Sequence, residues 1–588
     1  MSVAPRPEPH LRVALDPVLL ELVDAAGRRR FVEDVGERVR AVMETFGIPG
    51  IARVDVEPAT DDRTISVFAD GLSAPFPPAF LRRLWHGLAP SHLQDAAFEA
   101  GGVAGGPNVW LVVCARDGDA EARVAIVEML VELVPEVLAL QPSRLLTREA
   151  CAERLAGSPG LDLDEARAIM RELVDRGVSV ADGPLLLTLM RSCRQAGHSV
   201  VSTLEEVYAR VRSPTLAIIV NDSLFGQLVS DPGDETEVDL ADPRVDPQLS
   251  ATMAVVREHR LLEFHVTHAV TLVCDPQVGD DEMCIRLNDR VGPPIPVPGS
   301  RELGVSATRA RLKAHGIAAR PLVDAVTGSE LAAVDAHDAN KLRAVGMLPV
   351  TLGGYIAAAF ARAVTPSAHR LTTIDAVEAE LARVEEQLPS LVHGTLSRFR
   401  LAELTQLLRE LVREQISIRD SSRILNAALR YAELPDEVPS QFAGAITTRS
   451  DRGTGREISE LLAYVRSEIA DRVCFDTGLL GEIGDATLEV FETDGAFEAR
   501  ADEVLAATYS GATEESPGTN SVNALRDDVW RGLGATPPPA PVILTSSRIR
   551  RALRTAVAQE LPGARVLSRS EIPPGVQTAC VGTISCTC

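Results

Sequence analysis

Two kinds of hydrophobic pattern alternate along the first part of this chain. Residues 31–47, FVEDVGERVRAVMETFG, place apolar side chains at the spacing of an amphipathic helix that ends at Gly47. Residues 51–57 and 63–71 alternate apolar and polar positions, as half-buried strands do. Residues 121–212 then carry a series of amphipathic helical segments. This part of the chain is therefore predicted to mix helices and strands.

The same order of patterns recurs in the second half of the chain. A helical segment at 251–264 precedes two strand-like runs at 269–275 and 282–289. Several amphipathic helical segments follow between residues 351 and 432. A repeated order of elements is typical of an internal duplication.

Two pairs of segments carry the repeat. LVDRGVSVADGPLLL, Leu173 to Leu187, matches LVREQISIRDSSRIL, Leu411 to Leu425, in its Leu-Val pair, its serine between two β-branched residues and its aspartate. Thr147–Leu155 matches Thr373–Leu381 at a smaller offset, so the first copy lacks a short loop-like stretch that includes residues 389–399. We interpret the chain as a multidomain α+β protein with two tandem copies of one module, of which the first is degenerate.

The motif at Leu411 to Leu425 has a structural interpretation. A helix ends near Gln415, the ISI run crosses to the next element, and Ser417 or Asp420 caps the helix that follows. A corner of this kind sets the angle between two packed helices. It contains no nucleophile beside a base, so we predict no catalytic role for it.

Composition suggests where the domains meet. Residues 231–247 are rich in Asp, Glu and Pro without an apolar period, which predicts a flexible linker. Near the end of the chain, the apolar run PVIL, a serine-capped helix and the run ARVL predict a βαβ unit. The predicted domains are a degenerate first copy at 1–230, an acidic linker at 231–249, strand-rich α+β subdomains at 250–370, a helical subdomain at 371–445 and a C-terminal α/β subdomain at 446–588.

The charge and hydropathy of the chain exclude some classes of partner. Its 588 residues carry a net charge of −24, and phosphate binding needs clustered Lys and Arg, so no nucleic-acid partner is predicted. The short basic clusters at 28–30 and 546–554 are interpreted as solvated faces. The sequence has no run of 18 apolar residues and no apolar signal core, so no direct membrane insertion is predicted. Nine cysteines without a CxxC pair indicate a reducing cytoplasm.

The sequence contains no recognisable catalytic motif. It has no P-loop, no dinucleotide-binding glycine motif, no nucleophile elbow and no HExxH. His265 and His268 precede a strand-like run and are interpreted as structural or surface histidines. Cys580, Cys586 and Cys588 include one CxC without a nearby histidine, which is a weak signal for a metal. We predict no catalytic residue, no metal site and no cofactor.

The second copy resembles a known family. LTTIDAVEAEL followed by LAELTQLLRELVREQISIRDSSRILNAALRYA resembles the helical subdomain of the FHIPEP export-gate family of flagellar and virulence type III secretion proteins. The stretch from PVILTSSRIRRALR to SEIPPGV is similar to the C-terminal subdomain of that family, and MCIRLNDRVGPP resembles a strand and loop of its injectisome branch. The resemblance runs from about residue 250 to 585. The transmembrane half that family members carry before this region has no counterpart in the sequence.

The resemblance implies two interaction sites. DAVTGSELAAV is similar to a family motif in the cleft where chaperones dock, which assigns partner binding to Val326, Thr327 and Gly328. A purely structural turn at these residues is the alternative. The cytoplasmic half of the family forms a nonameric ring, and the corner around Arg419 and Asp420 is expected near its subunit contacts.

The resemblance implies a non-enzymatic, soluble component of a bacterial type III protein-export apparatus. This component is expected to be cytoplasmic, and peripheral at the inner membrane through partners. It would be a docking platform for chaperone–substrate complexes or for a full-length export gate. Its expected partners are type III secretion chaperones, export substrates, other export-apparatus proteins and copies of itself in a homo-oligomeric ring. The alternative is a soluble scaffold or regulator that keeps the export-gate fold without a secretion role.

Overall fold

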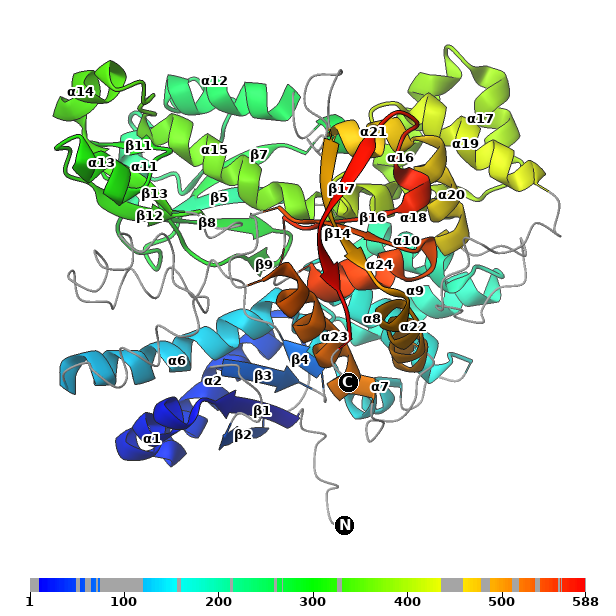
Figure 1. Ribbon diagram of the computed structural model, residues 1–588, viewed down its shortest axis with the longest axis horizontal. Helices are drawn as coiled ribbons and strands as arrows, with labels where there is room; N and C mark the ends of the chain where they lie inside the picture. The colour runs from blue at the N-terminus through cyan, green and yellow to red at the C-terminus, as the bar shows by residue number, and fades with distance from the viewer. Residues whose placement is uncertain are drawn as a thin grey trace. The chain divides into compact units, whose positions relative to one another are not determined.

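In the computed structural model the chain forms two compact units, and Figure 1 colours the ribbon by residue number. The first unit comprises Met1–Leu187, Arg212–Arg260 and Thr267–Thr365. The second unit comprises Thr188–Val211, Leu261–Val266 and Pro366–Cys588. The structure describes residues 10–48, 53–58, 65–69, 72–74, 120–155, 160–211, 215–258, 262–266, 268–324, 330–434, 458–476, 487–509, 518–534, 540–558, 561 and 563–586.

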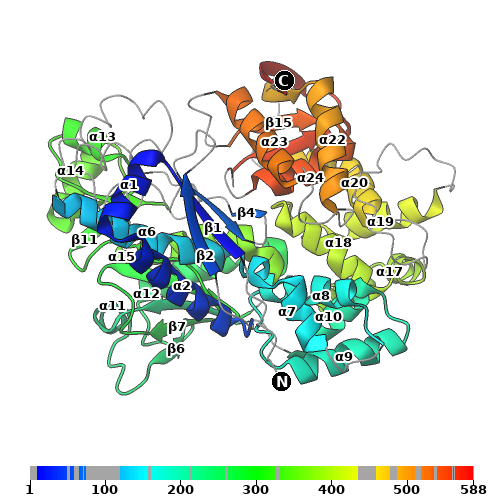
Figure 2. The same ribbon diagram turned by 90° about the horizontal axis from the view of Figure 1, so that it is seen from below.

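A four-stranded sheet begins the first unit. Its elements and the helices beside it are β1 (His10–Leu15), α1 (Pro17–Ala26), α2 (Arg28–Thr45), β2 (Arg53–Pro58), β3 (Ile65–Ala69), β4 (Leu72–Ala74) and α6 (Ala120–Leu140). The strand order is β2-β1-β3-β4, and Leu11, Val13 and Leu15 of β1 are fully buried. Helix α2 packs against β2 and lies side by side with α6 (Figure 2). The alternating pattern of β1 thus builds the core of this sheet.

A larger sheet follows in the same unit. Its elements and the helices beside it are β5 (Leu216–Val220), α11 (Asp222–Leu228), β6 (Glu237–Asp239), α12 (Pro247–Val256), β7 (Val270–Cys274), β8 (Glu282–Leu287), β9 (Arg290–Val291), β10 (Ile295–Pro296) and α15 (Leu352–Val364). The strand order is β10-β8-β5-β7-β6, and β9 pairs with β8. All five residues of β5 are buried, because this apolar run is the central strand. Helices α12 and α15 lie side by side (Figure 1), and α15 contacts β8.

The two sheets share a local topology. The strand β1 pairs in parallel with β2 and antiparallel with β3, and β5 pairs in parallel with β7 and antiparallel with β8. This shared order supports the hypothesis of tandem copies, which stays a prediction. The position of β5 corrects the predicted domain boundary at residue 230. This strand lies before that residue and is central to the second sheet.

The acidic segment 231–249 is built into the second sheet, so the predicted flexible linker is wrong. The strand β6 lies inside this segment and pairs antiparallel with β7. The side chains of Asp239 and Asp242 accept hydrogen bonds from backbone N–H groups of their own turns, both at 2.8 Å. Asp246 caps α12. The segment is acidic because its carboxylates satisfy turns and a helix end.

A smaller antiparallel sheet completes the first unit. Its elements are β11 (Glu302–Val305), α13 (Arg309–Ala314), β12 (Arg320–Val323), β13 (Glu330–Asp335), η4 (Ala336–Asp338) and α14 (Ala339–Ala344). The strand order is β11-β13-β12, and one core cluster contains Val305, Leu312 and Leu342. A Cβ atom added to Gly304 would lie 2.4 Å from the ring of Tyr355 on α15. The glycine therefore allows this sheet and α15 to approach closely.

Helices occupy the middle of the chain. The first unit contains η1 (Pro142–Leu145), α7 (Arg148–Leu155) and α8 (Leu163–Asp175), and the division between the units falls within α9 (Gly183–Gln195). The second unit contains α10 (Val200–Val211), η3 (Leu262–Phe264), η5 (Thr365–Arg370), α16 (Ile374–Glu385), α17 (Pro389–Leu396), α18 (Leu401–Arg413) and α19 (Ser421–Glu433). The stretch 389–399, interpreted as loop-like, contains α17. Among the helices that the structure describes, none has the length and apolar character needed to cross a membrane.

Helix α10 packs on α16 and α18 through a buried ion pair. The Arg409 guanidinium contacts both carboxylate oxygens of Glu205, with 2.7 Å between Nη2 and Oε2, and it donates to the Thr372 carbonyl at 2.6 Å. The Tyr208 hydroxyl donates to the Arg370 carbonyl at 3.0 Å. Helix α10, which lies within the predicted first copy, is therefore an integral part of the second unit.

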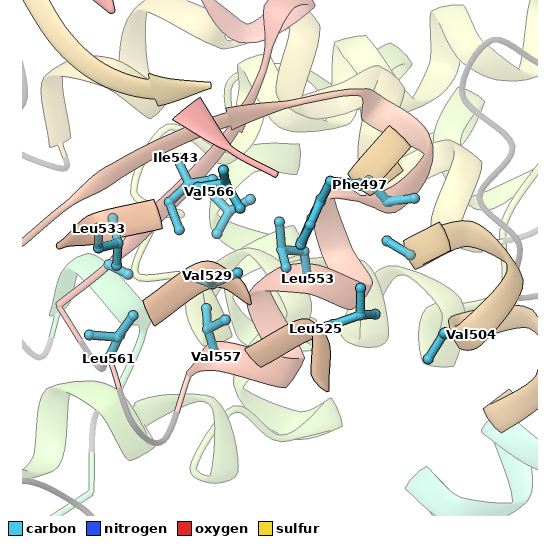
Figure 3. Packing of buried hydrophobic residues seen from close by; sticks show 14 residues of the cluster. Phe497, Val504, Leu525, Val529, Leu533, Ile543, Leu553, Val557, Leu561 and Val566 are labelled. Atoms are coloured by element: carbon cyan, nitrogen blue, oxygen red, sulfur yellow. The ribbon is translucent and has the colours of Figure 1, made fainter. Parts of the chain in front are cut away.

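The second unit ends in a parallel sheet of order β16-β15-β14-β17. Its elements and the helices around it are α20 (Ile458–Glu468), α21 (Ala470–Asp476), β14 (Thr487–Thr493), α22 (Gly495–Tyr509), α23 (Gly518–Leu533), β15 (Val542–Thr545), α24 (Ser547–Val557), β16 (Arg565–Ser568), η6 (Arg569–Glu571) and β17 (Gln577–Ile584). Phe497, Val529 and Leu553 of the helices pack against Ile543 and Val566 of the strands (Figure 3). The predicted βαβ unit is confirmed, because β15 and β16 pair in parallel on either side of α24.

Candidate functional site

The repeated motif forms a sharp corner between two helices in the second copy. We call residues 414–420 the second corner. Gln415 has a left-handed backbone with φ 60°, and the N–H of Ile416 bonds back to the Leu411 carbonyl at 3.0 Å. This arrangement closes the end of α18. The Asp420 side chain then accepts a bond from the Arg423 N–H and caps α19, so the predicted cap is confirmed.

The first copy builds the same corner at residues 176–182, which we call the first corner. Gly177 has φ 80°, and the N–H of Val178 bonds to the Leu173 carbonyl at 2.9 Å. Gly177 thus occupies the position that Gln415 has in the second corner. The shared sequence motif therefore encodes one backbone structure in both places.

The first corner supports the turn between β8 and β9. The side-chain amide of Asn288 donates to the Arg176 carbonyl at 2.6 Å, and the Asp289 N–H donates to the Gly177 carbonyl at 2.9 Å. A Cβ atom added to Gly177 would lie 2.7 Å from the Leu287 carbonyl oxygen. This corner therefore holds its neighbour through the backbone, and glycine is required for both its φ and its close contact.

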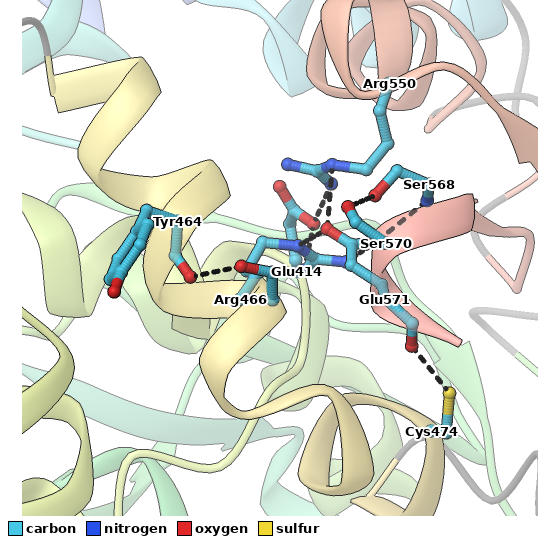
Figure 4. A network of polar contacts seen from close by, with 9 residues as sticks. Glu414, Tyr464, Arg466, Cys474, Arg550, Ser568, Ser570 and Glu571 are labelled. Atoms are coloured by element: carbon cyan, nitrogen blue, oxygen red, sulfur yellow. Dashed lines mark hydrogen bonds and ion pairs between the residues drawn. The ribbon is translucent and has the colours of Figure 1, made fainter. Parts of the chain in front are cut away.

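The second corner holds its neighbour through side chains. The Oε2 atom of Glu414 accepts hydrogen bonds from Nη1 of Arg466 and Nη1 of Arg550, each at 2.5 Å. Arg466 also binds both oxygens of Glu571, at 2.7 and 3.0 Å (Figure 4). Beside this group, Nη2 of Arg565 donates to the Gln415 amide oxygen at 2.8 Å. The corner thus joins the end of α18 to α20, α24, β16 and η6.

These charged groups are buried. Burial alone raises the pKa of the Glu414 carboxyl, but the charges of Arg466 and Arg550 outweigh burial and lower this pKa to about 2. The same two arginines lower the pKa of Glu571 against the effect of its burial. Both carboxylates are therefore ionised at neutral pH. Removing one side chain of this group would leave the charge of its partner buried and unpaired.

The basic cluster at 546–554 is a site that the sequence interpretation missed. Arg550 is only 2% exposed, so the prediction of a fully solvated face is wrong. Ile549 and Leu553 face the core of the C-terminal sheet, and Arg550 and Arg554 each follow one of them by one position. Arginines beside the apolar stripe of a helix can turn inward wherever a carboxylate meets them. The sequence does not reveal that Glu414, far away in the chain, provides this carboxylate.

The residues predicted to contact other subunits lie at the end of the second corner. Arg419 is exposed, and its N–H lies 3.4 Å from the Ser417 hydroxyl oxygen. Asp420 lies 3.9 Å from the Arg472 guanidinium in addition to capping α19. The exposure of Arg419 is compatible with a subunit contact, which stays a prediction.

The residues predicted to bind partners, Val326, Thr327 and Gly328, lie outside the described residues. The strands β12 and β13 pair antiparallel up to Val323 and Glu330, so these residues belong to the connection of a β-hairpin. Directly after β12, buried Asp324 binds the Nε atom of Arg362 at 2.5 Å. Arg320 on β12 binds Glu302 of β11 and Asp281. The strands that carry the hairpin are thus anchored by ion pairs.

Among the residues that the structure describes, the histidines and cysteines weighed as metal ligands form no group that could hold a metal ion. His265 is buried, burial lowers its pKa, and its Nδ1 atom lies 3.9 Å from Glu380. Cys580 is exposed, Cys586 is partly buried, and Cys588 lies outside the described residues. Within the part of the chain that the structure describes, no group of three or more His, Cys, Asp or Glu side chains could hold a metal ion.

Comparisons with known proteins identify the family. The FHIPEP family model matches residues 234–577, which is more than half of the chain. No curated protein matches the chain.

Solved structures with a similar fold include the Chlamydia pneumoniae CdsV protein, with 18% identity and a TM-score of 0.50 over 63% of this chain and 98% of that one. The Shigella flexneri MxiA protein has 13% identity and a TM-score of 0.44, over 63% of this chain and 98% of that one. The nonameric EscV cytosolic domain from the type III secretion system has 17% identity and a TM-score of 0.44, over 60% and 97%. The match to the family model shows that the chain belongs to the FHIPEP family, and over 63% of its length its fold is similar to that of the CdsV protein.

Proposed function

We propose that this chain is a non-enzymatic docking platform in a type III protein-export apparatus. The observation that carries the proposal is the family match over residues 234–577, which covers the strands of the second sheet from β6 onward, the helices α16 to α19 and the C-terminal sheet up to the start of β17. A platform needs to hold partners rather than transform them. We propose that it binds chaperone–substrate complexes or a full-length export gate.

The β12–β13 hairpin is the proposed docking site. The resemblance assigns partner binding to Val326, Thr327 and Gly328, and the described strands show how this hairpin is held. The buried Asp324–Arg362 pair fixes one end of β12, and Arg320 fixes the other through Glu302. A rigid base reduces the entropy lost when a hairpin engages a partner. These ion pairs therefore favour partner recognition by this hairpin.

The proposed platform works as a ring of copies of this chain. The EscV domain to which the chain is similar is described as nonameric. Exposed Arg419 and half-buried Asp420 at the end of the second corner are the proposed subunit contacts. The rigid link from this corner to the C-terminal sheet, through Glu414 and Gln415, would keep the contact surface in one geometry.

The docking proposal is tested by affinity capture from the native cell with the full chain as bait. Wild type, Val326→Asp and Val255→Asp would be compared, because Val255 is an exposed valine on α12 and gives a matched control. We expect wild type and Val255→Asp to recover export chaperones or gate proteins, and Val326→Asp to recover several-fold less. Equal recovery by all three would refute the hairpin as the site. A wild type that captures no export component would refute the platform and leave the regulator alternative.

A further inference from the structure

The last strand of the C-terminal sheet has a long open edge. The strand order is β16-β15-β14-β17, so β17 is an outer strand that pairs with β14 on one side (Figure 1). No strand among the described residues pairs with its other side. An outer strand directs the N–H and C=O groups of alternate residues away from the sheet. The strand β17 therefore presents hydrogen-bonding groups that a further strand would satisfy.

The strand β17 lacks the features that protect the other outer strands. Its sequence, QTACVGTI, has eight residues and contains neither a charged residue nor a proline. The outer strands β2, β6, β11, β12 and β16 each contain a charged residue, β10 contains a proline, and β4 has only three residues. Charge, proline and shortness all keep an edge from pairing with another chain. Among the outer strands that the structure describes, β17 is therefore the most open to a second strand.

The side chains of β17 are exposed along most of its length. The exposed residues are Gln577, Thr578, Cys580, Val581 and Thr583. Neighbouring residues of a strand point to opposite faces, so the first half of β17 is exposed on both faces. Val581 is 49% exposed and lies at a bulge, where the pairing with β14 shifts register. A bulge can twist an edge away from a partner, but this one leaves residues 577–580 in regular pairing with β14.

The far end of β17 is fixed in the core. Ile584 is fully buried in the hydrophobic cluster of the C-terminal sheet, and its carbonyl accepts a hydrogen bond from the Asp494 N–H at 3.0 Å. A Cβ atom added to Gly532 would lie 2.7 Å from the Ile584 side chain, so α23 packs closely on this end of the strand. The edge is thus formed before any partner arrives, which reduces the entropy lost on association.

We propose that β17 pairs with β17 of a second copy of this chain, as antiparallel strands related by a twofold axis. A twofold interface uses the same surface on both copies, so this surface must be complementary to itself. The strand β17 meets the requirement, because a chain with a net charge of −24 places no charge on it. Two copies can therefore pair along β17 without like charges facing each other across the two strands. The proposal does not rest on the docking function.

One antiparallel register pairs all eight residues of the strand. It places Gln577 opposite Ile584 of the other copy, and Thr578 opposite Thr583. Pairs of threonines across two strands are favourable, and Val581 would lie opposite Cys580 and lose part of its exposure. Two strands of this length bury little surface, so we expect a weak and reversible association.

The test measures the mass of the full chain by sedimentation velocity over about a hundredfold range of concentration. Hydrogen exchange of residues 577–584 is followed by mass spectrometry at both ends of this range. The first variant combines Thr578→Lys with Thr583→Lys, which places lysine opposite lysine in the proposed register. The second combines Thr578→Lys with Thr583→Glu, which places lysine opposite glutamate. The control is Thr555→Lys, because Thr555 is an exposed threonine on α24 in the same unit.

We expect the mass of wild type and of Thr555→Lys to double as the concentration rises, whether the smaller species is a single chain or a ring. Exchange at residues 577–584 should slow at the same time, because outward N–H groups become paired. The double-lysine variant should keep the smaller mass and the fast exchange. The lysine–glutamate variant should recover both the doubling and the slow exchange, because opposite charges then face each other.

The proposal is overturned if wild type does not double in mass, or if it doubles without slower exchange at residues 577–584. Equal doubling in wild type and in the double-lysine variant would also overturn it. A lysine–glutamate variant that fails to recover the doubling would contradict the proposed register. None of these results depends on whether the hairpin docks a partner, so the outcome for β17 is separate from that for the platform.

Discussion

Glu414 and Arg176 occupy the same position in the two corners but act by different chemistry. Arg176 offers its backbone carbonyl to Asn288, whereas Glu414 offers its side chain to Arg466 and Arg550. The backbone of the corner is the same in both, since each has one left-handed residue after the helix end. The two corners have the same backbone, and the identity of a single residue therefore decides which groups each corner binds.

Replacing Glu414 by Gln should destabilise the protein by about 3–5 kcal/mol, because two buried arginines would lose their shared anion. The measurement is the free energy of unfolding in urea, with the exposed Glu433→Gln on α19 as control. The folded pKa of Glu414 lies at about 2, below its usual 4.5, so its contribution is complete above about pH 4.5 and is lost as the pH falls towards 2. In Glu414→Gln this part of the acid dependence should be absent. A variant with wild-type stability and acid response would show that the carboxylate contributes nothing.

Gly177 gives a residue-scale test of the first corner. Gly177→Ala should destabilise the protein by more than Gly197→Ala, although both glycines are left-handed, at φ 80° and 77°. An added methyl meets the Leu287 carbonyl at 2.7 Å in the first case and nothing within 4 Å in the second. The left-handed backbone costs about 1 kcal/mol in each, and the close contact adds to it only at Gly177. Equal losses in urea unfolding would mean that the contact with the β8–β9 turn is unimportant.

At the scale of elements, the acidic segment 231–249 shows that composition alone can predict a linker where the chain forms part of a sheet. Asp and Glu are frequent both in unstructured linkers and in structured turns, because a carboxylate can cap a turn or a helix. Here β6 is a short edge strand on β7, and the side chains of Asp239 at its end and Asp242 after it accept hydrogen bonds from backbone N–H groups of their own turns. Short, charged edge strands also resist unwanted pairing with other chains. An acidic, apolar-poor segment can therefore be an ordered part of a sheet.

Limited proteolysis tests this assignment. We expect residues 231–247 to be protected while the protein is folded, because strand pairing and turn hydrogen bonds hold the backbone away from a protease. The cleavage sites would be identified by mass spectrometry of the first fragments. A first cut between residues 231 and 247 that leaves two folded halves would restore the linker hypothesis.

At the scale of the whole molecule, the ring proposal makes a prediction about size. By multi-angle light scattering, wild type should be larger than its single chain, and Arg419→Glu should shift the population towards the single chain. Arg398→Glu is the matched control, since Arg398 is also an exposed arginine of the second unit. Melting temperature should change little in both variants because neither side chain is buried. A wild type that is already a single chain, or equal sizes for all three, would contradict the proposed contact.

Short-range patterns were enough to predict several parts of this protein. The helical period predicts α2, α16, α18 and α19, and the C-terminal βαβ unit follows from two apolar runs around a helix. A cap at Ser417 or Asp420 follows from their place before an apolar-periodic run, and the structure selects Asp420. Family motifs in the second copy identify FHIPEP from the sequence alone. These features depend on neighbours within a few turns or strands, so the information lies close together in the chain.

Only the tertiary structure decided the features that join distant residues. The sequence does not show that β5 is central to the second sheet, that β6 pairs with β7, or that α10 joins α18 through Glu205 and Arg409. It equally could not show that Glu414 lies against Arg550, 136 positions later. Strand order and buried charge pairs depend on which surfaces meet after folding. A local hydrophobic pattern does not identify the distant segment that will pack against it. The sequence by itself thus determined the elements and the family, and folding determined the buried ion pairs of Glu414 and Glu571 with Arg466 and Arg550.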